Sequence, residues 1–222
     1  MLSGAGISAP SGLATFRDKD GIWSRYRIEE VATPEAWSKA PSVVLEFYNE
    51  RRAQAAAALP NEAHRAIALL ETRYEVVVVT QNVDDLHERG GSTRVIHLHG
   101  ELTKARSTDD PTLVYEVGGA AIQMGDCCSK GSQLRPHIVW FGEEVQHFEE
   151  AAEEVRSAGK LLVVGTSLSV FPAAGLVKVA RYDAEKIIVD VAAGNPPHGF
   201  KVLRGSAEKV VPALAEKWLK NV

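Results

Sequence analysis

Three apolar runs rich in β-branched residues constrain the fold of this chain most strongly. "YEVVVVT" begins at Tyr74, "KLLVVGT" at Lys160 and "KIIVDV" at Lys186. Continuous runs of this kind are typical of strands buried on both faces of a parallel sheet. A helical candidate accompanies each run, namely "NEAHRAIALLETR", "EEAAEEVRSAG" and "FPAAGLVKVARYD". This alternation predicts an α/β fold with a parallel sheet and helices on both of its faces.

Two segments interrupt the alternation. Residues from about 21 to 60 have a helical pattern with Trp and Tyr, and residues from 102 to 136 are Gly- and Asp-rich and strand-like. We expect these segments to form a smaller module against the main sheet. Open α/β folds bind ligands at the carboxyl ends of their strands, so the predicted site of chemistry is the cleft between sheet and module.

The charge and the cysteine content narrow the classes of function. The 222 residues carry a formal charge of -4, which weighs against nucleic-acid binding as the main role. The chain has no run of about 18 apolar residues, and its start, "MLSGAGIS", lacks the regions of a signal peptide. We therefore expect a cytoplasmic protein with no membrane partner. The two cysteines, Cys127 and Cys128, are adjacent and unsuited to an unstrained disulfide with each other.

Two glycine-containing loops are candidates for binding a nucleotide. "SGAGISAPSG" matches the GxGxxA form of the dinucleotide fingerprint through Gly4, Gly6 and Ala9. Such a loop lets backbone N–H groups approach a pyrophosphate without interference from a Cβ atom, although a structural glycine turn explains the pattern equally well. "VGTSLSVFPAAG" supplies small groups at another strand end, and ordinary loop structure is again an equal alternative.

Polar residues also follow the most hydrophobic strand. In "TQNVDDLHERGG", the side chains of Gln81, Asn82 and Asp84 would project into the cleft. Amide and carboxylate groups together suit a ligand that carries an amide and hydroxyls. The alternative is a helix start that is capped by Asp84 or Asp85.

The segment "VIHLHG" carries two histidines on one face of a short strand, His97 and His99. A histidine that precedes a glycine at a strand end is a candidate general base, because its usual pKa lies near neutrality; a structural role is the alternative. These histidines, with Cys127 and Cys128, also invite a zinc hypothesis. We expect no zinc site, because adjacent cysteines are poor chelators of a single tetrahedral ion.

Taken together, "GAGIS", "TFRD", "QNVD", "HLHG", "WFGE" and "GTSL", in this order, resemble the sirtuins, which are NAD-dependent protein lysine deacylases. The resemblance extends from Ser3 to the C-terminal helix. It implies a Rossmann-like NAD-binding domain formed by residues 1–20, 61–100 and 139–222. It also implies a small module with a helical lobe, residues 21–60, and a ribbon-like lobe, residues 101–138.

The resemblance implies where NAD binds. The pyrophosphate would lie along Gly4, Ala5, Gly6 and Ser8, and the nicotinamide ribose near Phe16 and Arg17. The nicotinamide end would be held by Asn82 and Asp84, with Gln81 also in the NAD-binding set. The adenosine side would meet Gly165, Thr166 and Ser167, with Asp190 and Ala207 near the adenosine.

The resemblance also implies the reaction and the partner. Nicotinamide leaves the ribose, the acyl oxygen of the lysine takes its place, and His99 removes a proton from a ribose hydroxyl; His97 is the less favoured base. The products are free lysine, nicotinamide and O-acyl-ADP-ribose. The substrate is an acyl-lysine protein or peptide whose backbone pairs as a strand with "VWFGE", where Val139, Phe141 and Gly142 would contact it.

The chain departs from the sirtuin pattern at two places. The two CxxC pairs of the family's zinc ribbon are missing between Glu101 and His137. We therefore expect packing of apolar residues to stabilise this lobe without metal. These residues are Leu113, Val114, Tyr115, Val117 and Ile122. The strand that normally precedes "GAGIS" is also reduced to Met1 and Leu2.

The helix predicted over "VVLEFYNERRAQAAAALP" bears on the acyl group. Its buried stripe consists of Val44, Phe47, Tyr48, Ala55 and Ala58. Arg51 falls in the same row with no acidic residue three or four positions away. Within the sirtuins, a Tyr-x-x-Arg pair marks members that prefer succinyl or malonyl groups, and Tyr48 with Arg51 match it. An Arg fork and a Tyr hydroxyl can bind a carboxylate through three hydrogen bonds; the alternative is that Arg51 extends along the helix to solvent.

Three other functions compete with deacylation. A dehydrogenase would need an acidic ribose contact after the second strand, and the sequence offers none. A mono-ADP-ribosyltransferase would share every NAD residue. A non-catalytic module that binds NAD or ADP-ribose is opposed by His99 and the complete "QNVD".

Overall fold

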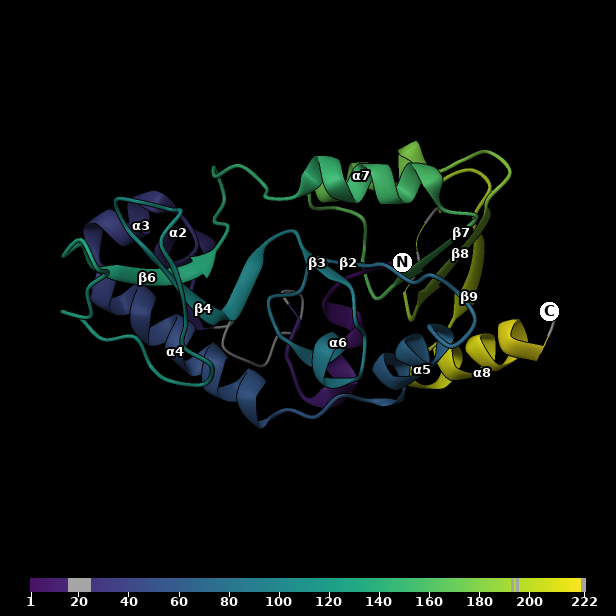
Figure 1. The fold of residues 1–222 in the computed structure, drawn as a ribbon, viewed down its shortest axis with the longest axis horizontal. Helices are drawn as coiled ribbons and strands as arrows, with labels where there is room; N and C mark the ends of the chain where they lie inside the picture. Colours follow the sequence, from purple (N-terminus) through teal and green to yellow (C-terminus); the bar gives the residue numbers. More distant parts are fainter. Residues whose placement is uncertain (16–24, 193, 195, 221–222) are drawn as a thin grey trace.

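The computed structural model describes residues 1–15, 25–192, 194 and 196–220, and these form two parts that lie side by side (Figure 1). The larger part contains a six-stranded sheet, and the smaller part contains a three-stranded sheet with helices packed against it. Phe16 and Arg17 lie outside the described residues. Among the helices that the structure describes, none is long and apolar enough to cross a membrane.

The larger sheet is entirely parallel, in the order β3-β2-β1-β7-β8-β9. Its strands are β1 (Leu2–Ser3), β2 (Val78–Thr80), β3 (Val95–His97), β7 (Lys160–Val164), β8 (Glu185–Asp190) and β9 (Lys201–Arg204). Once the inserted strands are set aside, this is the order of doubly wound dinucleotide-binding folds, with the direction of winding reversed beside β1. The prediction of a parallel α/β sheet is therefore confirmed.

Helices cover both faces of this sheet, as the apolar runs require. On one face lie α5 (Glu62–Leu70) and α8 (Ala207–Lys220), and on the other lie α7 (Phe148–Ser157) and the 3-10 helix η3 (Ala173–Val179). Alternate residues of the central strands point to the two faces, so that Leu162 and Val164 contact α8 while Leu161 and Val163 contact α7 and η3. The three helical segments predicted from sequence are present, the third as 3-10 rather than α-helix.

Short helices follow two of the strands at the carboxyl edge. The 3-10 helices η1 (Ala5–Ile7) and η2 (Ala9–Ser11) follow β1, and α6 (Leu86–Arg89) follows β2. They bring the chain back across the edge of the sheet within a few residues. The polar residues next to them are thereby held close to the strand ends.

The smaller module is assembled from the two interrupting segments. Its helices are α2 (Ile28–Val31), α3 (Pro34–Lys39) and α4 (Pro41–Ala57). Its antiparallel sheet has the order β5-β4-β6, with β4 (Gly100–Ser107), β5 (Val114–Glu116) and β6 (Leu134–Ile138). A separate core joins the helices to this sheet, because Val44, Phe47 and Tyr48 of α4 pack with Leu102 and Trp140.

The ribbon-like lobe is stabilised by fewer apolar contacts than the sequence predicts. Ile122 is buried against Leu45 and Ala105, whereas Val114 is 40% exposed. Val117 packs against the same cluster, and hydrogen bonds add to these contacts: the side chain of Gln133 accepts from the N–H of Gly125 at 2.7 Å and donates to Gln123 O at 2.9 Å. The prediction that five apolar residues knit this lobe is therefore correct for Ile122 and wrong for Val114.

Two buried histidines lie between α5, α6 and the start of the sheet. The rings of His64 and His87 are 4.9 Å apart, and His87 Nε2 is hydrogen-bonded to Ser3 Oγ at 2.9 Å. His64 Nε2 and His87 Nδ1 have no hydrogen-bond partner within the described part of the chain. Burial lowers the pKa of His64 to about 4 and that of His87 well below its usual value. Both rings are therefore neutral at pH 7.

This pair makes the folded state sensitive to acid. As the pH falls from 6.5 toward 4, the unfolded chain binds a proton at position 64 that the folded protein does not bind. The contribution of neutral His64 to the free energy of unfolding is present above pH 6.5. About 1 kcal/mol of the free energy of unfolding should be lost between pH 6.5 and 5.5. His64→Gln keeps a capping side chain at the third position of α5 but cannot titrate. The free energy of unfolding measured in urea should therefore fall by about 1 kcal/mol less over this pH range in His64→Gln than in the wild type. An unchanged pH dependence would show that His64 does not cause the acid sensitivity.

Candidate active site

The candidate residues gather at the carboxyl edge of the parallel sheet. The loop containing Gly4, Ala5, Gly6 and Ser8 follows β1, the segment of Gln81, Asn82 and Asp84 follows β2, and His99 follows β3. Gly165, Thr166 and Ser167 follow β7, Asp190 ends β8, and Ala207 begins the helix after β9. Because parallel strands end at the same edge, six chain segments meet there. The structure thus brings the described candidates to one edge of the sheet.

The two glycine loops are in direct contact where the direction of winding reverses. A Cβ atom on Gly4 would lie 2.7 Å from Thr166 Cβ, and one on Gly6 would lie 2.7 Å from Gly165 Cα. The N–H groups of Gly4 and Gly6 donate to Val164 O at 3.0 Å and Gly165 O at 2.8 Å. These two glycines therefore have a structural role, because only a residue without a side chain permits such close approach. Their contact with a pyrophosphate remains a prediction.

The polar residues after β2 form a buried hydrogen-bond chain. Asn82 Nδ2 donates to Ser8 Oγ at 3.2 Å, and Ser8 Oγ donates to Asp84 Oδ1 at 3.4 Å. Asp84 Oδ1 also accepts from the N–H of Leu86 at 3.2 Å, at the start of α6. Burial raises the pKa of Asp84, and the hydrogen bonds from Leu86 and Ser8 act in the opposite direction. Asp84 thus accepts a hydrogen bond at the start of α6, and its contact with the nicotinamide end of NAD remains a prediction.

Gln81 connects the β2 loop to the β7 loop. Its Nε2 donates to Thr166 Oγ1 at 3.1 Å, and its backbone carbonyl lies 3.1 Å from His99 Nδ1. A carbonyl oxygen can only accept, so His99 carries its proton on Nδ1 and has a lone pair on Nε2. Burial lowers the pKa of His99, which the hydrogen bond to Gln81 partly opposes. His99 is therefore neutral at pH 7, which is the form that a general base requires.

His97 is held differently, although it is only two residues away. Its Nδ1 lies 3.1 Å from Asn82 O, and its Nε2 lies 2.8 Å from Glu88 Oε1. Burial favours the neutral ring, but the hydrogen bond and charge of Glu88 raise the pKa of His97 above its usual value. With both ring nitrogens engaged by acceptors, His97 is a structural residue. The geometry therefore favours His99 over His97 as the base.

The predicted stripe of α4 is buried as expected, and Tyr48 is only 3% exposed. Tyr48 Oη accepts a hydrogen bond from Trp140 Nε1 at 3.1 Å, which leaves the phenolic proton to be donated elsewhere. Burial raises the pKa of Tyr48 to about 12, while the charge of Arg51 acts to lower it. Tyr48 therefore remains protonated at neutral pH.

Arg51 is partly buried, one turn from Tyr48 on the same helix. Its guanidinium lies 5.8 Å from the ring centroid of Phe47. Burial lowers the pKa of Arg51, and the charges of Tyr48 and Asp84 oppose this change.

Sequence analysis missed a second, more deeply buried arginine. Arg52 is 1% exposed, and it donates from Nε to Leu102 O at 2.6 Å and from Nη1 to Asn49 Oδ1 at 2.6 Å. It ties α4 to β4 of the small sheet. Its spacing from Leu45, Tyr48 and Ala55 is helical, and that spacing could have identified it.

A buried ion cluster anchors the "WFGE" segment, and sequence analysis missed it as well. The Glu143 carboxylate accepts from Arg106 at 3.0 and 3.1 Å and from Arg135 at 2.7 and 3.0 Å. It also accepts from the N–H of Trp140 at 2.8 Å, and the Arg135 guanidinium lies 3.2 Å from the Trp140 ring centroid. The cluster links the small sheet to Trp140 and, through Trp140, to Tyr48.

The segment Val139 to Glu143, which is predicted to pair as a strand with the substrate backbone, has no regular strand conformation on its own. Strand β6 ends at Ile138, and Phe141 and Gly142 form a turn in which Gly142 has φ 93°. The N–H groups of Val139 and Phe141 donate to His99 O at 2.9 Å and Ala32 O at 3.0 Å. These bonds and the Glu143 cluster curve the segment, so it is not a strand. Phe141 remains 47% exposed on its outer side.

The cysteines show no arrangement typical of a metal site. Cys127 is exposed and Cys128 is buried, and neither forms a disulfide. Across residues 1–15, 25–192, 194 and 196–220, no three His, Cys, Asp or Glu side chains are grouped so that they could hold a metal ion.

Comparisons with known proteins agree on one family. The family model described as "Sir2 family" matches residues 4–172. A curated NAD-dependent protein deacylase of Helicobacter pylori is 49% identical over 99% of this chain and 96% of its own length. One from Bacteroides thetaiotaomicron is 47% identical over 97% and 95%, respectively.

Solved structures give the same result. A Sir2 homologue mutant in complex with ADP ribose superposes with a TM-score of 0.89 at 40% identity, covering 100% of this chain and 92% of that one. A Sir2 homologue in complex with NAD gives 0.88 at 40% identity, covering 99% and 88%. A Sir2 protein bound to acetylated peptide gives 0.82 at 28% identity, covering 98% and 91%.

Proposed function

Because this chain belongs to the Sir2 family of NAD-dependent protein deacylases, we propose that it prefers lysine acyl groups that end in a carboxylate, such as succinyl and malonyl. Acetyl-lysine is a second substrate, since the rest of the proposed substrate site requires only an acyl-lysine. The observation that carries the proposal is that half-buried Arg51 lies one turn from buried Tyr48 on α4, beside the ring of Phe47. Both are donors, and a carboxylate accepts from both.

The surroundings of Tyr48 and Arg51 support this preference. Tyr48 Oη already accepts from Trp140, and its high pKa keeps a proton that it can donate to an acyl carboxylate. Arg51 is in a partly desolvated position, where a charge-assisted hydrogen bond contributes about 1.5–3 kcal/mol. An acetyl group has no carboxylate and gains neither contact. The expected result is a preference of about tenfold or more.

The residues at the sheet edge fit NAD as the co-substrate. The glycine loops lie side by side where the direction of winding reverses, and Asn82 with Asp84 offers polar groups beside them. Next to Ala207, the buried Ser206 Oγ has no partner among the described residues, at the N-terminus of α8. NAD supplies the ribose carbon that receives the acyl oxygen when nicotinamide leaves. The relatives solved with NAD and with ADP ribose support this placement.

His99 is the general base of the proposed mechanism. Its Nε2 lone pair removes a proton from a ribose hydroxyl, while Nδ1 remains hydrogen-bonded to Gln81 O. The same hydrogen bond orients the ring toward the cleft. Gln81 is therefore a positioning residue for His99 as well as a member of the NAD-binding set.

The substrate backbone is proposed to lie along Val139, Phe141 and Gly142. This segment is tied on its inner side to His99 O and Ala32 O, so it spans the boundary between the two parts of the molecule. Phe141 presents an exposed apolar surface to a peptide. The related Sir2 protein bound to acetylated peptide supports an acyl-lysine peptide as the partner.

Trp140→Phe tests the contact with Tyr48. The substitution keeps an aromatic ring beneath Arg135 but removes the N–H that donates to Tyr48 Oη. Loss of one hydrogen bond should raise KM for a succinyl-lysine peptide by about three- to tenfold. The KM for an acetyl-lysine peptide should stay within about twofold. In a Tyr48→Phe background the same change should add nothing, and equal losses on both peptides would contradict the proposal.

We also propose that the ribbon-like lobe holds no structural zinc. Hydrogen bonds of Gln133 and the packing of Ile122 stabilise the lobe without using a thiol. Elemental analysis of the purified protein should find far less than one zinc per chain, and a strong chelator should leave the urea unfolding midpoint unchanged. One tightly bound zinc per chain would overturn this proposal.

A further inference from the structure

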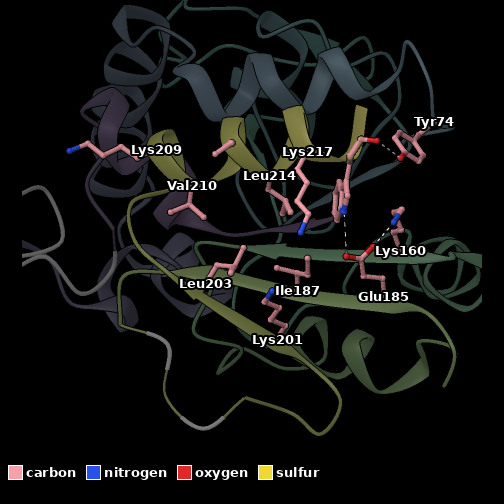
Figure 2. A pocket seen from close by; sticks show the side chains of 12 residues that line it. Tyr74, Lys160, Glu185, Ile187, Lys201, Leu203, Lys209, Val210, Leu214 and Lys217 are labelled. Carbon is pink, nitrogen blue, oxygen red and sulfur yellow. Dashed lines mark hydrogen bonds and ion pairs between the residues drawn. The ribbon is translucent and has the colours of Figure 1, made fainter. Parts of the chain in front are cut away.

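A groove with a cavity of about 590 Å³ lies between α8 and the sheet, away from the candidate active site (Figure 2). Its residues from the sheet include Lys160, Glu185 and Lys201, which are the first residues of β7, β8 and β9. The proposed NAD residues follow the last residues of these strands. The groove therefore opens toward the amino end of the sheet and is a separate site.

The floor of the groove is apolar. It is formed by Ile187 and Leu203 from the sheet and by Val210, Leu214 and Trp218 from α8. The polar atoms at one end are already used: Trp218 Nε1 donates to Glu185 at 3.3 Å, and Tyr74 Oη donates to Trp218 O at 3.0 Å. On the floor of the groove, the backbone of β8 is paired with β7 and β9, so a peptide lying over β8 would leave its own amides without partners. A hydrocarbon chain has no such groups.

The rim of the groove carries an excess of positive charge. Lys201, Lys209 and Lys217 form no ion pair with any residue that the structure describes, and Glu185 is the single acidic residue among those lining the groove. Glu185 is itself paired with Lys160. This concentration of cations occurs on a chain whose formal charge is -4. The rim is therefore complementary to an anion.

We propose that this groove binds a linear amphipathic carboxylate of the medium-chain fatty acid class. The alkyl chain lies on the apolar floor, and the carboxylate pairs with a rim lysine. The floor residues Val210 and Trp218 are eight positions apart on α8, which corresponds to about 12 Å. That length suits a medium chain, and the cavity lies within the usual range for small-ligand pockets. The proposal is independent of the acyl preference.

The test is calorimetric titration of the full-length protein with hexanoate, octanoate and decanoate, each below its micelle-forming concentration. If the chain lies on the floor, Kd should fall by about fourfold for each methylene group buried. Binding should weaken as salt rises, since the lysines are exposed. Equal Kd values for the three acids, or no heat of binding with decanoate, would overturn the proposal.

Two variants locate the site. Ala213 is exposed and lines the groove, so Ala213→Trp fills it without disturbing the core and should abolish decanoate binding. Lys201→Glu combined with Lys217→Glu should weaken binding at least tenfold. Lys39→Glu, in the helical lobe, is the matched control and should bind as the wild type does. All of these variants should keep their deacylase activity, and decanoate binding that survives in Ala213→Trp would place the ligand elsewhere.

Discussion

His99→Ala is expected to lower kcat for deacylation by about a thousandfold. A positioned general base contributes about 10²- to 10⁴-fold, and the neighbouring His97 has both ring nitrogens engaged by acceptors. The methyl group of alanine can neither accept the ribose proton nor hold the hydrogen bond to Gln81 O. Turnover measured by mass spectrometry of an acylated peptide with NAD checks the prediction.

The affinity for peptide should survive this substitution, because His99 acts on the ribose hydroxyl. Calorimetry of the variant with peptide separates loss of chemistry from loss of folding. His147→Asn is a suitable control, since His147 is exposed and has the positive φ that asparagine tolerates. Turnover close to the wild-type value in His99→Ala would show that another group is the base.

Arg51→Met is expected to reduce kcat/KM for a succinyl-lysine peptide by about 10- to 100-fold and to change that for an acetyl-lysine peptide by less than about threefold. Methionine fills a similar volume and keeps the apolar contact with Phe47, so the helix should remain intact. What is lost is a charge and the fork that binds both carboxylate oxygens. A panel of succinyl, malonyl, glutaryl and acetyl peptides measures the change in preference.

Two further arginine variants sharpen this experiment. Arg51→Lys keeps the charge but loses the fork, so its activity on succinyl-lysine should lie between wild type and Arg51→Met. Arg65→Met removes an exposed arginine from α5 and should change neither activity. If Arg51→Met lowers both activities equally, the arginine is structural. If the wild type has no activity on acidic acyl groups, the proposed preference itself fails.

The sequence predicted the sheet because its strands are buried on both faces and therefore show as uninterrupted apolar runs. It also predicted α4 and its buried stripe, because helical periodicity is a local property. The same periodicity would have identified Arg52, but the sequence prediction singled out only Arg51, which has no acidic residue three or four positions away. The partners of Arg52 are a backbone oxygen from β4 and an amide oxygen from α4. Because these partners are uncharged, the pattern of charges along the sequence does not predict them.

One error occurred where distant segments decide the local environment. Val114 was expected inside the ribbon-like lobe because it is apolar, yet β5 lies at the edge of a three-stranded sheet and Val114 is 40% exposed. The conformation of "VWFGE" is likewise set by distant residues, because Glu143 is hydrogen-bonded to Arg106 and Arg135 and the backbone turns at Gly142. In both cases tertiary contacts decide what the local pattern does not show.

The sequence by itself determined the family, the parallel sheet and most candidate residues, because motif order and hydrophobic periodicity are written along the chain. The resemblance had already favoured His99 over His97 as the candidate base, and only the tertiary structure gave the physical reason. His97 and His99 share one strand pattern, but His97 Nε2 is hydrogen-bonded to Glu88, whereas His99 is hydrogen-bonded to Gln81 O through Nδ1. Protonation state and hydrogen bonding depend on burial and on neighbours brought from other parts of the chain, and a linear pattern does not contain that information.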